Sequence, residues 1–343
     1  MRNIKAILLG LGAVGKEIVR GSYQKGVDYV AAFNRSPRLI GQDIGHVIGG
    51  SEMGASVLHI DEMETFIEKN PVDIAIITVP VPFEANALPQ VRMLLSHKIN
   101  VLTALADVYV MERNFPDIFE ELDALAKANG VTFFASGIQD VFWTALPVAL
   151  TGCSLEIKEI KGVNVALIDH FGPGVADECY VGWELDKFNK ANESGELPVN
   201  DFLIALYEIA KKLGLHPYHQ KSMLKPLLAK QDAYFATIDR HVKAGQLLGN
   251  YVESFIKTEE GIILSCEMVS KMSEEGDTDL NSWEIIGVPN INLITEHMQG
   301  EITTGSNIVN RIPDVINAAP GVASASKMAA PFFKAHPLNE YIK

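Results

Sequence analysis

The chain has 343 residues, of which 48% are hydrophobic and 21% are charged, and its formal net charge at pH 7 is −14. This length and composition predict a globular protein of two domains, each able to bury its own core. The acidic balance argues against nucleic acid and against anionic membrane surfaces as partners. Three widely spaced cysteines form no C-x-x-C pair, which predicts a reduced chain in the cytoplasm. No apolar run reaches the length of a membrane span.

The first predicted element is a strand over 4–9 that runs directly into a glycine-rich turn. Gly10 permits the tight turn, Gly12 lets a pyrophosphate approach the backbone, and Gly15 lets the next helix pack closely on the sheet. An amphipathic stretch and a second strand over 27–33 follow, and this context predicts a dinucleotide-binding unit. The alternative is a glycine-rich turn that binds nothing. We expect cofactor contacts from Gly10, Gly12, Ala13, Val14 and Gly15.

The end of the second strand indicates which cofactor the site prefers. An NAD-selective site usually carries an acidic residue here that bonds the ribose 2′-OH, but position 34 is an asparagine. Arg35 can pair with a 2′-phosphate, and Asn34 and Ser36 can donate hydrogen bonds to it. We therefore expect NADP(H) to be preferred, with NAD(H) also possible. The alternative is that Arg35 only stacks on the adenine or faces solvent.

Strand–helix alternation continues to about residue 135. Apolar runs predict strands over 71–80, 100–103 and 131–135, with helices over 85–96 and 115–129. Repeated βα units of this length imply an α/β, Rossmann-type, doubly wound parallel sheet with right-handed crossovers.

The pattern changes near residue 150 to that of an α+β domain with a mostly antiparallel sheet. We predict strands over 156–169, 283–286 and 290–296, a hairpin over 254–268, and helices over 201–213 and 219–230. A last helix over 304–316 is expected to pack back on the first domain. The predicted domains are therefore a dinucleotide-binding domain, residues 1–142 and 303–343, and a substrate-binding and dimerisation domain, residues 143–302.

Four motifs point to one known family. They are GLGAVG at 10–15, SGIQDVFW at 136–143, VKAGQ at 242–246, and IVNRIP at 308–313 followed by Pro320-Gly321. In this order, over nearly the whole chain, they resemble the 2,4-diaminopentanoate dehydrogenases and the related native amine dehydrogenases, whose fold is similar to that of dihydrodipicolinate reductase. The resemblance implies an oxidoreductase acting on CH–NH2 donors. Such an enzyme aminates a small ketone or aldehyde with ammonia and NAD(P)H, or runs the reverse oxidative deamination. A homodimer with a substrate pocket between the domains is also implied.

The resemblance implies that the acid–base residue lies in a threonine-started stretch that usually ends in two glutamates. Here the stretch is Thr103-Ala104-Leu105-Ala106-Asp107, so Asp107 is its one acid, and a shorter one. Asp107 follows a buried strand at the end where open α/β sheets place ligands, and apolar neighbours would raise its pKa. One carboxylate can position ammonia, protonate the departing water and stabilise an iminium cation. The alternative is a helix N-cap or a solvated loop acid.

Further site residues are expected around this carboxylate. By resemblance, Phe142 and Trp143 line the substrate pocket beside Ile138, and an apolar wall suits an aliphatic ketone. Tyr180 follows a stretch rich in glycine and proline that is a candidate pocket rim. The alternative for the two aromatic residues that follow Ile138 is ordinary core packing. We also expect cofactor contacts from Thr78, Val79, Pro80 and Asn307.

Two other functions remain open from the sequence. One is a dihydrodipicolinate-reductase-like reduction of a C=N or C=C bond in amino-acid metabolism, and the other is a non-enzymatic NADP-binding redox sensor. The chain lacks a match to the H-H-x-x-K signature, which weakens the first. That function would also need a basic pocket residue, for which Lys161, Arg240 and Lys243 are candidates. His216 and His219 have no third ligand nearby, so we predict no metal site.

Overall fold

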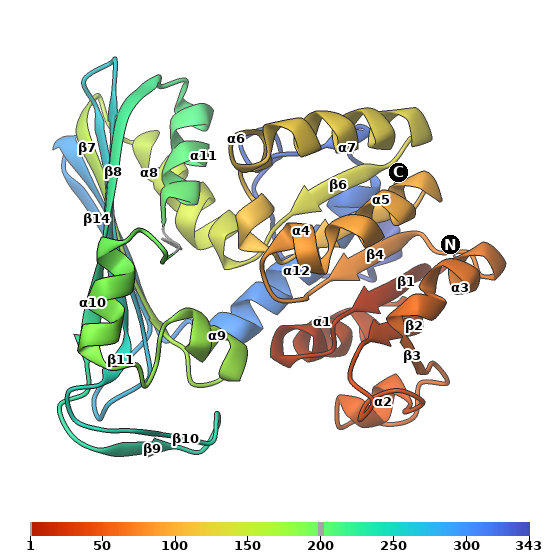
Figure 1. Cartoon of the computed structure of the whole chain (residues 1–343). Helices are drawn as coiled ribbons and strands as arrows, with labels where there is room; N and C mark the ends of the chain where they lie inside the picture. The colour runs from red at the N-terminus through yellow and green to blue at the C-terminus, as the bar shows by residue number, and fades with distance from the viewer. Residues whose placement is uncertain (1, 198–201) are drawn as a thin grey trace. The chain divides into compact units, whose positions relative to one another are not determined.

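A computed structural model describes residues 2–197 and 202–343, which form two compact units. The first unit runs to Val141 and is completed by Glu301–Lys343, and the second is Phe142–Gly300. Each unit has its own sheet (Figure 1). The fold class is as predicted, with a Rossmann-type parallel sheet in the first unit and a mostly antiparallel sheet in the second.

The first unit contains a seven-stranded parallel sheet in the order β15-β6-β5-β4-β1-β2-β3. Strand β1 pairs with β2 on one side and with β4 on the other, so the strand order reverses between β1 and β4. Ligands of open α/β sheets bind at such a point, beyond the carboxyl ends of the strands. The strands are β1 Ile4–Leu9, β2 Val27–Asn34, β3 Val57–His59, β4 Ile74–Ile77, β5 Asn100–Thr103, β6 Thr132–Ala135 and β15 Gly321–Val322.

Helices cover both faces of this sheet. Helices α5 and α7 pack against each other, and α12 approaches α1 so closely that a Cβ on Gly305 would lie 3.0 Å from the Cβ of Glu17. The predicted helix over 85–96 is two helices, because Ala87 departs from helical geometry and Pro89 starts a new first turn. The helices are α1 Ala13–Tyr23, α2 Ile44–Val47, α3 Met63–Lys69, α4 Phe83–Asn86, α5 Leu88–Ser96, α6 Met111–Asn114, α7 Pro116–Asn129 and α12 Gly300–Ile316.

Residues after α12 return to the start of the first unit. The Lys25 ammonium donates to the Lys334 carbonyl at 2.9 Å, and the Leu338 N–H donates to the Lys25 carbonyl at 2.9 Å. The Lys334 side chain is fully buried, 3.0 Å from Asp314 of α12 and over the ring of Phe332. Strand β15 in the same stretch adds the edge strand beside β6. Residues 301–343 are therefore an integral part of the first unit.

The second unit contains a six-stranded sheet in the order β14-β13-β7-β12-β11-β8. Its neighbours are antiparallel except for the parallel pair of β12 with β7. The predicted hairpin is present as β11 and β12, and a short ribbon of β9 and β10 lies outside the sheet. The strands are β7 Glu156–Leu167, β8 Pro217–Leu228, β9 Ala233–Phe235, β10 Arg240–Val242, β11 Leu247–Thr258, β12 Ile263–Lys271, β13 Leu280–Val288 and β14 Ile291–Glu296.

The predicted helix over 219–230 is wrong. Residues 219–228 belong to β8, which pairs with β11 at the edge of the sheet. Leu224, Leu227 and Leu228 have the spacing of one helix face, but Pro226 removes a backbone donor and is tolerated at a sheet edge. The predicted helix over 201–213 is present as α11, Leu203–Leu213, and residue 201 lies outside the described residues.

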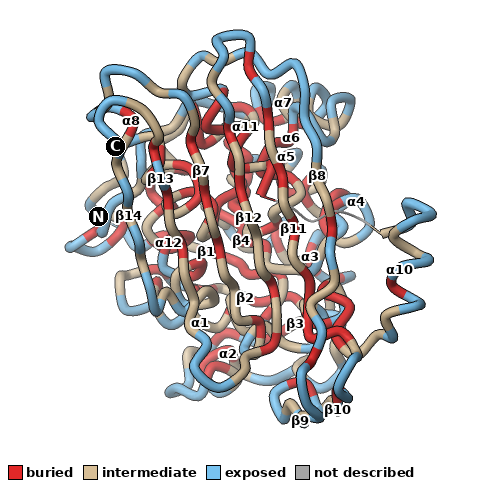
Figure 2. The backbone as a smooth tube through the Cα atoms, turned by 90° about the vertical axis from the view of Figure 1, so that its left-hand side faces the viewer, coloured by how far each residue is buried: buried red, intermediate tan, exposed pale blue. Residues whose placement is uncertain are grey.

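One face of the second sheet is covered and the other is open. Helix α11 packs against β11 and β12, and α8 (Leu146–Thr151) packs against β13. On this covered face the rings of Phe202 and Trp283 stack at 5.6 Å between centroids. Figure 2 views the sheet from the other side, and along its strands half-buried residues alternate with buried ones. The remaining helices of this unit are α9 Pro173–Glu178 and α10 Leu185–Glu193.

Candidate active site

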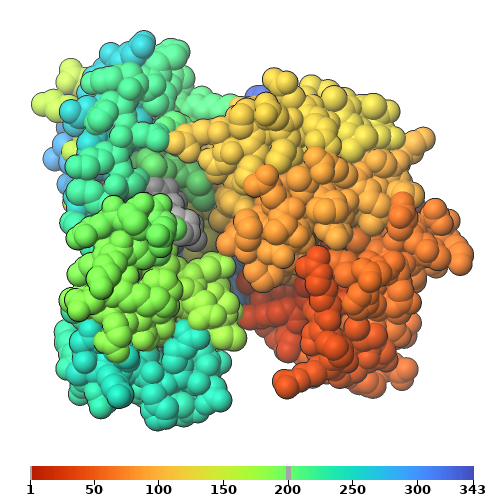
Figure 3. All heavy atoms as spheres, in the orientation of Figure 1, coloured from red at the N-terminus to blue at the C-terminus, as the bar shows by residue number. Residues whose placement is uncertain are grey.

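The glycine-rich turn after β1 is fixed by the end of β4. Gly10 has a φ of 87°, and a Cβ there would lie 2.7 Å from the Thr78 carbonyl oxygen. The Thr78 hydroxyl donates to the Gly10 carbonyl at 2.7 Å. A Cβ on Gly15 would lie 2.5 Å from the same Gly10 oxygen. Two of the three glycines are therefore required by the close approach of backbone to backbone. Figure 3 shows the surface of this region, where the red atoms of the chain around α1 adjoin the orange atoms of the chain around α4.

The third glycine leaves room for a ligand. Gly12 is the N-cap residue of α1, and no atom lies within 4 Å of where its Cβ would be. No side chain caps the helix, and its first turn, which includes Ala13 and Val14, contains no acidic residue. Backbone N–H groups at such a helix start attract an anion. The residues present therefore fit the pyrophosphate of a dinucleotide.

The end of β2 carries the residues expected to select the cofactor. The Asn34 side-chain oxygen accepts a hydrogen bond from the Ser36 N–H at 2.8 Å, which leaves the Asn34 amino group as the donor. Arg35 is exposed. Asn34 pairs in register with His59, the last residue of β3. The arrangement supplies donors and no carboxylate at residues 34–36, and the preference for NADP(H) stays a prediction.

Asp107 lies in a single 3₁₀ turn, Ala106–Val108, just after β5. The Thr103 hydroxyl, which donates to the Ile77 carbonyl at 3.1 Å, accepts from the Leu105 N–H at 3.2 Å and so fixes the entry to this turn. Asp107 Oδ2 accepts from the Phe83 N–H at 2.7 Å, at the start of α4. Asp107 Oδ2 thus helps to hold the start of α4, although Asp107 is not itself the N-cap residue, which is Pro82 for α4 and Leu105 for its own turn.

The second carboxylate oxygen, Oδ1, is unpaired within residues 2–197 and 202–343. Asp107 Oδ1 is buried and has no hydrogen-bond partner among the described residues. Burial raises the pKa of Asp107, backbone N–H groups of Phe83, Asp107 and Val108 partly oppose this, and the charge of Glu84 adds to the increase. A carboxyl group with a raised pKa and a free oxygen is suited to exchanging a proton with a reactant.

The residues after β6 form a compact turn that leads into a π-helix, Gln139–Ala145. Ile138 is half-buried, whereas the other residues of 131–140 are buried. The Tyr109 hydroxyl donates to the Gln139 carbonyl at 3.3 Å and joins this turn to the one that holds Asp107. Because β5 and β6 are adjacent, Asp107 and Ile138 lie at the same edge of the sheet. The turns after β1, β4, β5 and β6 are thus brought together in the first unit.

Asn307, an expected cofactor contact, lies beneath the β6 turn. Its side chain is 6% exposed, and its amino group donates to the Gly137 carbonyl at 2.6 Å. Its side-chain oxygen lies 3.4 Å from the Ser136 hydroxyl, which donates to Asp140 at the shorter distance of 2.7 Å. The amide group thus has partners within the protein. Val79 and Pro80 follow directly after Thr78 at the end of β4, beside the glycine turn.

The other expected substrate contacts lie in the second unit. Trp143 is 7% exposed, donates to Asn164 Oδ1 at 3.1 Å and packs 4.5 Å from the ring of Phe202. The carbonyl of Phe142 accepts from the Trp283 indole at 2.7 Å. Tyr180 is 6% exposed and packs in an apolar cluster of this unit. These environments match the core-packing alternative, and contact with substrate stays a prediction.

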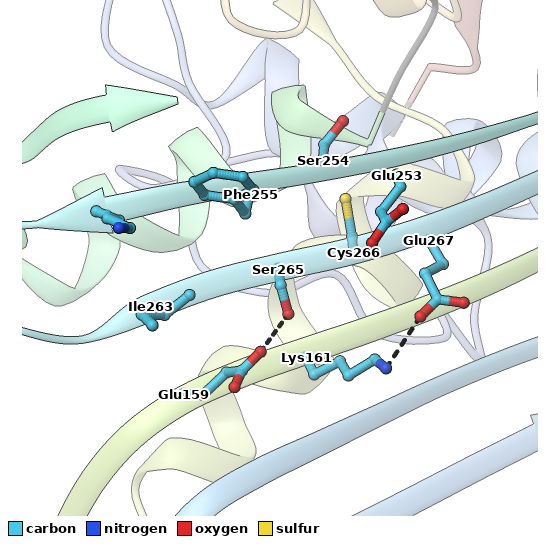
Figure 4. Close-up of a pocket in the computed structure, with 10 residues that line it drawn as sticks. Glu159, Lys161, Glu253, Ser254, Phe255, Ile263, Ser265, Cys266 and Glu267 are labelled. Carbon is cyan, nitrogen blue, oxygen red and sulfur yellow. Dashed lines mark hydrogen bonds and ion pairs between the residues drawn. The ribbon is translucent and has the colours of Figure 1, made fainter. Parts of the chain in front are cut away.

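The candidate basic residues of a carboxylate-binding pocket include two with acidic partners. The Lys161 ammonium lies 2.9 Å from Glu267, and Arg240 lies 2.6 Å from Asp177. Lys161 belongs to a pocket on the open face of the second sheet, where Glu159 also accepts from Ser265 at 2.6 Å (Figure 4). Within 2–197 and 202–343, no three His, Cys, Asp or Glu side chains form a group that could hold a metal ion. Over the same ranges, no helix has both the length and the apolar character to span a bilayer.

Sequence reasoning missed the ion pair of Asp140 with Arg311, which holds the β6 turn against α12. Arg311 donates to both carboxylate oxygens, at 2.7 and 2.9 Å. The partners are 171 positions apart, so no local pattern joins them. The one available signal was that both lie in motifs that carry the family resemblance.

A parallel sheet with a glycine turn at its switch point, combined with a unit built on a mixed sheet, defines the class of Rossmann-type two-domain oxidoreductases. Comparison with known proteins specifies this further. The chain belongs to the family defined by the 2,4-diaminopentanoate dehydrogenase C-terminal domain, whose model matches residues 142–340. A model described as a CoA binding domain matches residues 1–104.

Individual relatives agree with this assignment. The 2,4-diaminopentanoate dehydrogenase of Acetoanaerobium sticklandii is 27% identical over 96% of this chain and 95% of its own length. The solved structure of an amine dehydrogenase from Mycobacterium smegmatis is 30% identical, with a TM-score of 0.91 over 97% of this chain and 98% of that one. The redox-sensing transcriptional repressor Rex of Caldicellulosiruptor saccharolyticus is 33% identical over only 81 residues, 23% of this chain and 33% of the repressor.

The raised pKa of Asp107 makes the stability of the fold depend on pH. A carboxyl group whose pKa is higher in the folded state favours folding below its ordinary pKa of 3.8, and this contribution is lost as pH rises through the folded value. As pH rises from the ordinary pKa of Asp107 to its folded value, the free energy of unfolding of Asp107→Asn should increase relative to that of wild type. Above this range the difference should stay constant. Urea unfolding at a series of pH values measures the difference.

Asp43→Asn is the matched control, since its pKa is shifted the other way. Burial raises the pKa of Asp43, but hydrogen bonds from the backbone of Met53, Gly45, Gly54 and Ala55 together outweigh it and lower the pKa. Asp43→Asn should therefore lose stability relative to wild type as pH rises. A difference between Asp107→Asn and wild type that does not change with pH would contradict the assigned burial effect.

Proposed function

We propose that this chain is an NAD(P)H-dependent amine dehydrogenase. In the amination direction a small ketone or aldehyde, ammonia, NADPH and a proton give the amine, NADP⁺ and water, and the reverse reaction is oxidative deamination. The observation that carries the proposal is the Asp107 carboxylate, held by the Phe83 N–H at the ligand edge of the sheet with Oδ1 unused. The family match and the two dehydrogenase relatives support the reaction class.

The cofactor would be held by the turn after β1. The free N–H groups at the start of α1, from Gly12 to Val14, would bind the pyrophosphate, and Thr78 keeps the turn in place from β4. Asn34, Arg35 and Ser36 would donate to the 2′-phosphate of NADP(H). When bound, the cofactor supplies the hydride.

Asp107 would carry the acid–base chemistry. Ammonia would add to the carbonyl carbon as the C–O π bond breaks, and one proton would pass from the new ammonium nitrogen to the oxygen to give the carbinolamine. The carbinolamine then loses water, for which Asp107 Oδ1 delivers a proton to the departing hydroxyl group. The resulting carboxylate stabilises the iminium cation, whose carbon accepts the hydride as the amine forms. The fixed position of Oδ2 keeps Oδ1 in one orientation through these steps.

The half-buried Ile138 would supply an apolar wall beside this carboxylate, and a role of Phe142 and Trp143 in substrate binding stays a separate proposal. Apolar lining favours a small aliphatic ketone or aldehyde over a charged substrate. A reductase of an amino-acid precursor needs a cation for the substrate carboxylate. Two of the candidate cations, Lys161 and Arg240, are already paired with acidic side chains, which favours an uncharged substrate. All three cysteines are free, which fits a reducing compartment such as the cytoplasm.

A cofactor-binding redox sensor is a second candidate, favoured by the partial similarity to Rex. The two functions separate in one assay, in which NADPH consumption is followed with a panel of small ketones, aldehydes and keto acids, with and without ammonia. An amine dehydrogenase consumes NADPH only when ammonia and a carbonyl compound are both present. A sensor binds the cofactor without turnover, and a C=C or simple carbonyl reductase needs no ammonia.

We also propose that the working form is a homodimer built on the open face of the second sheet. A half-buried apolar row crosses four adjacent strands on this face. Its members lie in register and are Leu280, Val165, Val269 and Tyr251. A stable interface needs about 800 Å² from each partner, which is 20–30 residues. One face of a six-stranded sheet is a surface of that size, and a second copy offers it the same apolar row.

If Asp107 exchanges the proton, Asp107→Asn should lower kcat by a factor of about 100 or more while NADPH still binds with its wild-type Kd. Asp107→Glu should retain activity, because it keeps the carboxyl group. Glu84→Gln is the matched control, since it removes a nearby acid whose charge raises the pKa of Asp107. It should stay active and shift to lower pH the limb of the pH–rate profile along which amination is lost as pH rises, because Asp107 must be protonated to act as the acid. Wild-type turnover by Asp107→Asn would place the acid elsewhere.

The cofactor preference is tested by titrating NADPH and NADH against wild type, Arg35→Ala and Asn34→Asp. Arg35→Ala should weaken NADPH binding about tenfold and leave NADH nearly unchanged, because only the 2′-phosphate is lost as a partner. Asn34→Asp should swing the preference toward NADH through repulsion of that phosphate. Equal losses for both cofactors, or no loss for either, would exclude a selective role of Arg35.

Val165→Glu tests the dimer, because it places a charge in the middle of the apolar row. Light scattering after gel filtration should show a dimer for wild type and a monomer for Val165→Glu, with the dimer Kd raised at least tenfold. Leu155→Glu is the control, since Leu155 is 89% exposed and precedes β7. Dimerisation of Val165→Glu at wild-type strength would assign the interface to another surface.

A further inference from the structure

Helix α12 holds the turn after β6 at two points. Asn307 and Arg311 are one helical turn apart, so their side chains lie on the same face of α12. Asn307 donates to the carbonyl of Gly137, and Arg311 binds the carboxylate of Asp140. Ile138, the half-buried residue of this turn, lies between these two contacts.

The ion pair between Arg311 and Asp140 is fully desolvated. The two side chains are 1% and 2% exposed, and the Arg311 Nε and Nη2 atoms bind the two carboxylate oxygens. The Ser136 hydroxyl also donates to Asp140 at 2.7 Å, and Arg311 donates to the Ala329 carbonyl at 2.7 Å. A planar guanidinium fork fixes distance and angle together, which a lysine cannot do. Buried ion pairs add little net stability to a fold. We therefore assign this pair a role in fixing the geometry of the turn.

The turn itself allows little variation. Gly137 has a φ of 144°, and a Cβ there would lie 2.6 Å from the Gln139 side-chain oxygen. From the side of the proposed catalytic residue, the Tyr109 hydroxyl holds the Gln139 carbonyl. Contacts from α12, from the Asp107 turn and from within the segment therefore converge on five residues, 136–140.

We infer that Asn307 and Arg311 are positioning residues of the proposed amination site, acting through the 136–140 turn to set Ile138 relative to Asp107. The inference rests on the proposed function. It also changes the role expected for Asn307, whose amide group is used to hold the turn rather than to bind the cofactor. Both side chains are buried beneath the turn, so we expect them to act through it on the carbonyl substrate and not on the nucleotide.

The test compares Asn307→Ala and Arg311→Lys with wild type. Both variants should raise KM for the carbonyl substrate about tenfold and lower kcat less, while the Kd of NADPH changes by less than about twofold. Arg92→Lys is the matched control, because Arg92 also binds a carboxylate through two nitrogens, with Glu121 at 2.6 and 2.7 Å, on the surface of the same unit. It should leave all three constants unchanged.

Two further measurements test the inference without relying on activity alone or on a single variant. Amide hydrogen exchange of 137–143 should accelerate at least tenfold in Asn307→Ala and Arg311→Lys but not in Arg92→Lys, because only the first two release the turn. In an Ile138→Ala background, Asn307→Ala should add little to KM, since the residue through which it acts is gone. If Arg311→Lys does not fold, Asn307→Ala alone tests the positioning role, because it removes only one side-chain amide.

The outcomes separate the two proposals. Wild type without ammonia-dependent turnover rejects the proposed function, whatever the exchange data show. An active wild type with unchanged KM and unchanged exchange in Asn307→Ala rejects the positioning role. A Kd for NADPH raised tenfold by Asn307→Ala, with KM for the carbonyl compound unchanged, assigns Asn307 to the cofactor and overturns the inference.

Discussion

The hydrogen bond from the Thr78 hydroxyl to the Gly10 carbonyl ties together the two strand ends at which the sheet reverses its order. It forms only because two glycines let the β1 turn approach the end of β4, where any side chain would collide with backbone. The start of α1 then points its free N–H groups into the crevice that ligands of such sheets occupy. The next two strands, β5 and β6, place Asp107 and Ile138 along the same edge.

Asp107 would combine a structural role with the proposed chemical role in one side chain. One oxygen holds the start of α4 through Phe83, and this bond keeps the carboxylate from rotating. The other oxygen has no partner in the part of the chain that the structure describes, and its burial costs free energy and raises the pKa of Asp107. Such an unsatisfied group in a folded protein calls for an explanation, and proton exchange with a reactant supplies one. The contact with α4 alone would leave Oδ1 without a use.

Local patterns in the sequence predicted most of the parallel sheet and its glycine turn, because each βα unit is built from contiguous residues. The prediction failed at β8, where the leucine spacing resembles a helix and only the pairing with β11 decides for a strand. It also missed β15 and the Asp140–Arg311 pair, whose partners are far apart in the chain. Asp107 was predicted as a site residue from the resemblance and from its place after a strand, whereas the buried oxygen without a partner among the described residues could be seen only in three dimensions.

Residues 301–343 complete the first unit with the helix beside α1, the edge strand beside β6, and the contacts of Lys334 and Leu338 with Lys25. This has a consequence for synthesis. A ribosome makes the chain from its N-terminus, so β1 to β6 emerge well before α12 and β15. Until then the α1 surface and one sheet edge stay uncovered, and exposed apolar surface of this kind favours aggregation or binding by chaperones. The second unit, Phe142–Gly300, is contiguous. All of its residues are therefore made before those that complete the first unit.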